Sequence, residues 1–332
     1  MVAGNGELVN GAGGGGRPRY RDLPAVEDGS GARLAWDYFG RKDELGTLNF
    51  ISPEAVLRGR DEIRTGERIG LTLPQDLPDP PLSVGRRPYE HAIEVRRNGR
   101  DDSVSSFFLQ GSSQWDGLRH VRYKQFGYYG GRQEEDLNGD ELGVDRMAEA
   151  GIVTRGVLID VPAFRAAAGR TSQADTRDPV TVAEIEEICA WERVDLAPGD
   201  ILLLRTGWLA WYLGLDAAGR ESLRASLHNS EGGLECPGLA SGVGTAEWLW
   251  DHGIAAVAAD NPALEVLRVD RVVGFLHRFL IPMLGMPIGE YWYLEGLHQA
   301  AAGDGRFTCC LFSQPLRIPR AAGSPSNALA VR

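Results

Sequence analysis

Gln110-Gly111-Ser112-Ser113-Gln114-Trp115-Asp116-Gly117-Leu118-Arg119-His120 is the stretch that decides how we interpret this chain. Its polar side chains Gln114, Asp116 and His120 stand at even spacing, which on an extended segment places side chains on one face. The small residues between them let the backbone approach whatever those side chains hold. Because a divalent metal ion needs oxygen and imidazole donors that converge on one point, the stretch predicts a metal site.

Outside this stretch, helix and strand patterns alternate along the chain, most regularly from residue 141 onward. A capping box of Thr181 and Glu184 indicates the start of one helix. Alternation of this kind is typical of an α/β fold with a partly parallel, mixed central sheet. We expect helices at 53–64, 144–150, 181–191, 245–252 and 294–302, and strands at 90–96, 104–115, 156–161, 200–205, 254–259 and 307–312.

Composition divides the chain into three parts. Residues 1–30 are rich in glycine and are expected to form a disordered tail, residues 31–325 a single catalytic domain, and residues 326–332 a C-terminal tail. A proline-rich arm, 74–88, is too long and apolar for a free loop in a compact domain. We therefore expect this arm to wrap a neighbouring subunit in a homodimer or homotetramer.

Charge and cysteine usage exclude several classes of function. The net charge of −11 and the pI of about 5.1 argue against a nucleic-acid partner or an anionic membrane surface. No apolar run approaches the roughly 18 to 20 residues that a membrane span needs. The four cysteines show no CxxC spacing, so they are interpreted as free thiols of a cytoplasmic protein. The sequence also lacks a P-loop, a GxGxxG before a helix and a GxSxG, which argues against nucleotide-binding enzymes and serine hydrolases.

The opening stretch resembles the signature of the cyclase-type metal hydrolases, which include bacterial kynurenine formamidase and isatin hydrolase. That signature reads His-x-Gly-Thr-His-x-Asp-x-Pro-x-His. In register, Gln110 and Gln114 fall on its first two histidines, Asp116 on the aspartate, Leu118 on the proline and His120 on the last histidine.

Further similarity to this family lies in residues 199–208 and 237–258, and the resemblance covers roughly residues 40–325. It implies the swivelling β/β/α fold of the family, which periodicity alone does not predict. It also implies the family's metal-dependent chemistry and its habit of forming dimers or tetramers.

In that family the two histidines replaced here by glutamines supply one metal site, and Asp116, His277 and Glu290 match the residues that supply the other. The resemblance therefore implies one divalent metal ion, with Gln114 as an outer or weak ligand. The oxygen-rich set favours Mn²⁺, with Zn²⁺ and Mg²⁺ as other candidates. Two alternatives stay open: Glu295 competes with Glu290, and the glutamines would also fit a metal-free relative.

His120 corresponds to the acid/base of the family, a role that suits imidazole because its pKa lies near neutral pH. The alternative for both His120 and His277 is a hydrogen-bonded core histidine, and for Asp116 a structural carboxylate in a turn. The expected substrate pocket consists of Gln110, Trp115, Tyr128, His228, Asp260 and Asn261.

The sequence thus predicts a metal-dependent hydrolase of a small cyclic or aryl amide or lactone, with a metal-activated water and His120 as acid/base. A metal-free cyclase, dehydratase or isomerase that uses His120 and Asp116 as acid and base is the alternative. A non-catalytic binding protein on the same scaffold is the third hypothesis. The expected partner is a small molecule in every case.

Overall fold

A mixed sheet of nine strands runs through the computed structural model, which describes residues 16–83, 85–227, 233–270 and 272–332. The four central strands β5, β7, β9 and β10 are parallel, and the strands on both sides of them are antiparallel. This arrangement confirms the predicted α/β class. The order across the sheet is β1 (Arg68–Gly70), β13 (Ala328–Val331), β11 (Thr308–Ser313), β5 (Ile152–Asp160), β7 (Ile201–Arg205), β9 (Ala256–Ala259), β10 (Ile288–Glu290), β4 (Gln114–Asp116) and β12 (Gly323–Pro325).

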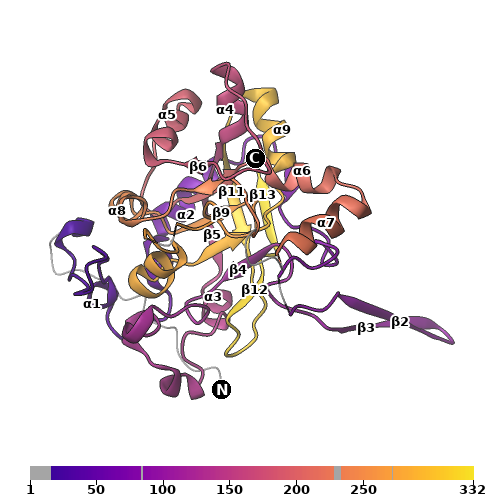
Figure 1. The fold of residues 1–332 in the computed structure, drawn as a ribbon, viewed down its shortest axis with the longest axis horizontal. Helices are drawn as coiled ribbons and strands as arrows, with labels where there is room; N and C mark the ends of the chain where they lie inside the picture. The colour runs from indigo at the N-terminus through magenta and orange to yellow at the C-terminus, as the bar shows by residue number, and fades with distance from the viewer. Residues whose placement is uncertain (1–15, 84, 228–232, 271) are drawn as a thin grey trace.

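Helices cover both faces of this sheet (Figure 1). Successive residues of β7 point to opposite faces, so Leu202 and Leu204 pack with α5 (Val182–Glu192) and α8 (Val243–His252), whereas Ile201 and Leu203 pack with α9 (Glu295–Asp304). Burial on both faces accounts for the continuous apolar runs of the central strands.

Two of the predicted helix starts are confirmed by side-chain caps. The hydroxyl of Ser52 accepts a hydrogen bond from the amide of Ala55 at the start of α2 (Pro53–Asp61), and Thr181 caps α5 in the same way. The remaining α-helices of the described residues are α1 (Trp36–Phe39), α3 (Asp145–Ala150), α4 (Val161–Ala167), α6 (Trp208–Gly214) and α7 (Ala217–Leu227). No described helix is both long enough and apolar enough to cross a bilayer.

Both predicted tails require correction. Residues 16–30 pack against the body, where Tyr20 and Leu23 are buried and the Tyr20 amide donates to Asp251; the first fifteen residues lie outside the described chain. Residues 326–332 contain β13, which lies between β1 and β11 with Ala328 and Ala330 buried. The period-two burial of small residues, not their polarity, decides the structure of this end of the chain.

The proline-rich arm packs on its own chain. Leu82 of the arm and Leu73, which directly precedes it, are buried with Trp208 and Tyr212 of α6, so the apolar character of the arm has an intramolecular explanation. Beyond it, β2 (Glu90–Arg96) and β3 (Gly99–Ser105) form an exposed hairpin that projects from the body (Figure 1). The predicted single strand over 104–115 is wrong, because β3 and β4 are separate and a loop joins them. A two-residue pairing of β6 (Pro179–Val180) and β8 (Gly238–Leu239) forms a further small sheet.

Candidate metal centre

Two neighbouring strands place the acidic part of the site. Strands β4 and β10 are antiparallel, with Gln114 directly opposite Glu290 and Asp116 opposite Ile288. Because side chains alternate along a strand, Gln114, Asp116 and Glu290 all point to one face. The amide nitrogen of Gln114 donates to Glu290 Oε2 at 2.7 Å, which holds the two side chains together.

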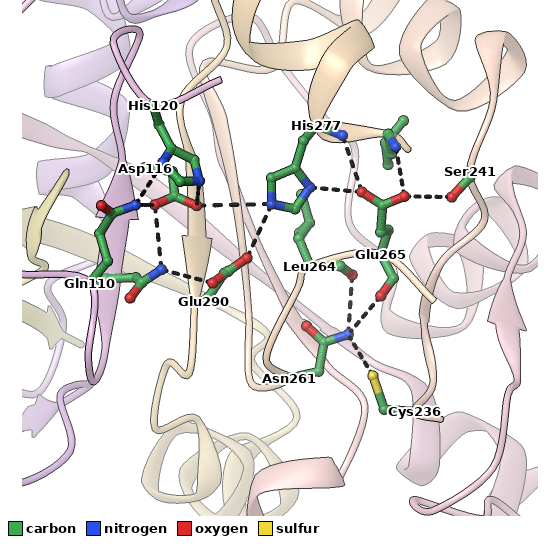
Figure 2. A network of polar contacts seen from close by, with 12 residues as sticks. Gln110, Asp116, His120, Cys236, Ser241, Asn261, Leu264, Glu265, His277 and Glu290 are labelled. Carbon is green, nitrogen blue, oxygen red and sulfur yellow. Dashed lines mark hydrogen bonds and ion pairs between the residues drawn. The ribbon is translucent and has the colours of Figure 1, made fainter. Parts of the chain in front are cut away.

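His277 completes the group from a different part of the chain, just before the π-helix at Phe279–Leu284. Its Nε2 lies 3.2 Å from Glu290 Oε1 and 3.9 Å from Asp116 Oδ2 (Figure 2). One ligand atom from each of these three side chains falls within 4.8 Å of the other two. All three residues are buried, so the structure brings together the set that the family resemblance implied.

Two polar atoms at this point have no hydrogen-bond partner. Asp116 Oδ2 and Gln114 Oε1 are both buried and unpartnered among the described residues. A buried oxygen without a partner costs free energy, so native proteins satisfy nearly all such atoms. A divalent cation accepts oxygen and imidazole ligands together, and the donors present therefore fit one such ion.

The charge balance of the group supports the same conclusion. Burial, and after it the negative charge of Asp116, raise the pKa of Glu290 to about 7. Burial alone would lower the pKa of His277, but hydrogen bonds to Glu265 and Glu290 raise it to about 10. The cluster thus retains a proton on His277 where a metal ion would otherwise supply the positive charge.

Glu265 is a residue of the candidate site that the sequence did not predict. It is fully buried, and its Oε1 accepts from His277 Nδ1 at 2.7 Å and from the His277 amide at 3.1 Å. Its Oε2 accepts from the Leu276 amide and from Ser241 Oγ, both at 2.6 Å (Figure 2). When Nε2 is deprotonated to bind a metal ion, this carboxylate keeps the remaining ring proton of His277 on Nδ1, and it turns Nε2 toward Asp116 and Glu290. An isolated acid in the apolar run from 263 to 267 was the signal that could have identified it.

Gln110 connects Asp116 to His120. Its amide nitrogen donates to Asp116 Oδ1 and lies 3.0 Å from His120 Nδ1. The opposite amide orientation would place oxygen against the carboxylate, so His120 Nδ1 is the acceptor and its ring proton lies on Nε2, 3.6 Å from Asp116 Oδ2. Burial lowers the pKa of His120, although Asp116 opposes the shift, and the ring is therefore neutral at pH 7.

A glycine of the C-terminal region makes room for Gln110. A Cβ atom on Gly323 of β12 would lie 2.5 Å from Gln110 Cγ and 2.6 Å from the carbonyl oxygen of Trp115. Glycine is thus the residue that lets β12 pair with β4 directly behind this side chain. Strand β12, directly before the segment that composition assigned to a tail, thus lies against the site.

Other residues predicted for the substrate pocket have structural contacts instead. Trp115 points to the opposite face of β4, is fully buried against Trp292 and donates to Ser313 Oγ at 2.8 Å. Tyr128 donates to Glu134 on its own loop at 2.7 Å, and no described contact joins it to Asp116. The prediction of Trp115 as a pocket residue is therefore wrong, because strand alternation places it in the core.

The two predicted pocket residues that follow β9, Asp260 and Asn261, form hydrogen bonds to the backbone of other segments. Asp260 is buried and accepts from the amides of Thr206 and Gly207, and burial raises its pKa to about 6. The side-chain nitrogen of Asn261 donates to the Pro237 carbonyl at 2.7 Å and lies near the carbonyls of Leu264 and Glu265 (Figure 2). Asn261 thus holds the loop that carries Glu265.

One further candidate does not join the group, and a second lies outside the described residues. Glu295, the competitor of Glu290, forms an ion pair with Arg205 at 2.8 Å and is not part of the Asp116 cluster. His228 lies outside the described residues.

Comparisons with known proteins identify the family. Residues 68–266 match the Cyclase family model, described as "Putative cyclase". A crystal structure described as a novel cyclase is 32% identical, covers 90% of this chain and 99% of its own, and has a TM-score of 0.78. No curated protein sequence matches the chain.

Two isatin hydrolases share the fold at lower identity. Isatin hydrolase A from Labrenzia aggregata is 17% identical over 80% of this chain and 93% of its own, with a TM-score of 0.57. Isatin hydrolase A from Ralstonia solanacearum is 19% identical over 82% and 92%, with a TM-score of 0.54. The family match and the sequence identity to the novel cyclase lead to one conclusion: this chain belongs to the cyclase family.

Proposed function

We propose that this protein is a metal-dependent hydrolase of a small cyclic or aryl amide or lactone. The observation that carries the proposal is the convergence of Asp116, His277 and Glu290 on one point where Asp116 Oδ2 has no hydrogen-bond partner among the described residues. The isatin hydrolases that share the fold favour hydrolysis over the alternative reactions.

Asp116, His277 and Glu290 would hold one divalent ion, with Gln114 Oε1 as a weak or outer ligand. Such an ion polarises a scissile carbonyl and lowers the pKa of a water molecule. Mn²⁺ is preferred because oxygen atoms outnumber nitrogen in this set. Glu265 orients His277 for this role through the Nδ1 hydrogen bond.

His120 would exchange the proton of the reaction at Nε2, the ring nitrogen that Gln110 leaves free. To take a proton from water there, neutral His120 must carry its own proton on Nδ1. This state requires the amide of Gln110 to turn by half a rotation, so that Oε1 accepts the Nδ1 proton and the hydrogen bond to Asp116 Oδ1 is given up. His120 then returns the proton from Nε2 to the leaving group. Gln110 thus occupies the position of the first histidine of the family signature, but we assign it a hydrogen bond to His120 in place of a metal ligand's role.

Metal analysis and one variant test this function. Protein purified without chelator should contain one divalent ion per chain. His120→Ala should lose turnover by roughly 10² to 10⁴-fold while it retains the metal. His91→Ala is the matched control, because His91 lies on the exposed hairpin and pairs only with Asp102 among the described contacts.

Other outcomes would reassign the function. Two zinc ions per chain, or loss of metal in His120→Ala, would contradict the proposed roles. Turnover by metal-free protein would favour a cyclase, dehydratase or isomerase, and metal-free protein without turnover would favour a binding protein.

We also propose that the protein is a homodimer or a larger homo-oligomer, through the β2–β3 hairpin. An isolated two-stranded hairpin is marginally stable in water, and this one exposes Ile93 by 51% and Val95 by 77%. Contact with a second copy would bury these side chains. Light scattering should report a dimer or larger for the full chain and a monomer when residues 91–104 are replaced by a short glycine linker; a monomeric full chain would refute the proposal.

A further inference from the structure

A cavity of about 310 Å³ lies beside the residue that links Asp116 to His120. The arm before the hairpin and the loop after it form its walls, and Gly111, the neighbour of Gln110, is part of the lining. Three aromatic side chains, Tyr89, Phe107 and Phe108, line it as well. Tyr89 and Phe107 meet edge to face, with ring centroids 5.9 Å apart. The cavity thus offers an aromatic surface close to the candidate metal centre.

Arg86 lies between this cavity and the metal centre. Its side chain lines the cavity, is half-buried, and donates through Nη1 to the backbone carbonyl of Gln110. Among the residues that the structure describes, no carboxylate forms an ion pair with its guanidinium within 4.0 Å. A guanidinium presents five N–H donors, so most of this group is available to a ligand.

Gln110 connects Arg86 to the reactive groups. The guanidinium donates to the backbone carbonyl of Gln110, and the side-chain amide of Gln110 contacts both Asp116 Oδ1 and His120 Nδ1. A ligand bound to Arg86 would therefore lie beside the residue that links Asp116 to His120.

We propose that Arg86 binds a carboxylate of the substrate, while Tyr89, Phe107 and Phe108 contact an aromatic ring that bears it. The proposal rests on the proposed hydrolase function and narrows its substrate to an anionic aryl amide or lactone. A guanidinium pairs with a planar carboxylate through two parallel hydrogen bonds, which gives orientation as well as affinity.

Other charges of the cavity do not compete for this role. Arg87, Asp76 and Asp79 line the same cavity but are exposed, and solvent and salt screen exposed charges. Arg86 is the half-buried one of the four, so its charge is screened least. The two aspartates would repel an anion placed at the rim and favour its position beside Arg86.

Binding of benzoate and of benzamide, its neutral isostere, tests the proposal. Calorimetry on the full-length protein should show that benzoate binds at least ten-fold more tightly than benzamide. Arg86→Gln should lose ten-fold or more in benzoate affinity and little in benzamide affinity. Arg87→Gln is the matched control and should lose less than about two-fold. Arg86→Lys keeps the charge but not the paired hydrogen bonds, so an intermediate loss is expected.

Equal binding of the two ligands to wild-type protein, or equal losses in Arg86→Gln and Arg87→Gln, would overturn the proposal. Thermal unfolding of each variant shows that it is folded. The titrations are repeated after chelation, because a carboxylate can also bind a metal ion. Benzoate affinity that disappears with the metal but survives Arg86→Gln would also overturn it. Absence of any metal would refute the proposed hydrolase, yet the Arg86 titration would still decide this inference.

Discussion

His277 and His298 both lie beside buried carboxylates, but their surroundings differ in charge. Around His298, Arg205 donates to Asp160 at 2.8 Å and to Glu295 at 2.8 Å, and His298 Nδ1 lies 2.5 Å from Asp160 Oδ2. Around His277, three carboxylates converge, and none of them forms an ion pair with a lysine or arginine among the described residues.

The difference shows how one set of residue types can serve two purposes. In the His298 cluster, a protein cation already neutralises the carboxylates, and both oxygens of Asp160 have partners. In the His277 cluster, the amides of Gln110 and Gln114 partner some oxygens but bring no charge, and Asp116 Oδ2 remains unpartnered. The first cluster is complete without a ligand, whereas the second needs a cation from outside.

The largest expected effect is on metal affinity, which should depend on the His277 cluster and not on the His298 cluster. Asp116→Asn should weaken Mn²⁺ binding by more than about 10²-fold, because it removes a charged ligand and not merely an outer-shell partner. Asp160→Asn, the matched change in the His298 cluster, should leave affinity within about two-fold. Competition with a fluorescent chelator measures both constants. Similar losses in the two variants would show that the clusters do not differ as described.

A substitution in the His298 cluster should instead change the free energy of unfolding. Arg205→Met leaves Asp160 buried without its counter-charge and should lower the free energy of unfolding by about 3 to 5 kcal/mol. Its metal affinity, measured on the folded protein, should not change. Urea denaturation of metal-free protein gives the stability. A loss below about 1 kcal/mol would mean that Arg205 does not complete the cluster.

An intermediate effect is expected at the carboxylate that orients His277. Glu265→Gln keeps the shape of the side chain but offers a weaker acceptor to Nδ1, so metal affinity should fall by roughly 10 to 100-fold. Ser241→Ala removes a donor on the far oxygen of Glu265 and serves as its control, with a loss of a few-fold at most. Equal losses would indicate a general packing effect. Electron paramagnetic resonance of bound Mn²⁺ should change in Glu265→Gln alone.

The smallest expected effect concerns Glu192, a buried carboxyl group beside the His298 cluster. Burial raises the pKa of Glu192 to about 9, its Oε2 has no partner, and its Oε1 accepts from the Asp160 amide. An acid whose pKa is higher in the folded than in the unfolded chain stabilises the fold at low pH. That contribution is lost as pH rises from the unfolded value of 4.5 toward 9.

Between pH 6 and pH 8, wild-type protein should therefore lose stability relative to Glu192→Gln, by at most about 1.4 kcal/mol per pH unit. Chemical denaturation at the two pH values gives the difference. Parallel pH profiles for the two proteins would show that Glu192 does not titrate in this range.

The sequence predicted the centre of the sheet better than its edges. The apolar runs of β5, β7 and β9 are buried on both faces, so composition alone identifies them. Strands β12 and β13 are short and composed of small residues, and their partners β4 and β1 are distant in sequence. No local pattern indicates such pairing, which explains why residues 326–332, where β13 lies, were interpreted as a tail.

Within the site, the resemblance supplied the residues but not their contacts. The spacing of Gln114 and Asp116 predicted a shared face, and the same alternation excludes Trp115 from it. Glu265 and Gln110 act through hydrogen bonds to other side chains, and those depend on how separate loops meet. The spacing of residues along the chain does not predict such contacts between loops.

Two tryptophans packed behind β4 should give the site a signal in circular dichroism. Trp115 and Trp292 meet edge to face with ring centroids 4.8 Å apart, and the Trp292 indole donates to the carbonyl of Gln114 at 3.0 Å. Indoles this close couple their electronic transitions, so the pair should contribute a split band to the circular dichroism spectrum. Any ligand that shifts Gln114 moves one indole relative to the other, and occupancy of the site can be followed by spectroscopy without an added label.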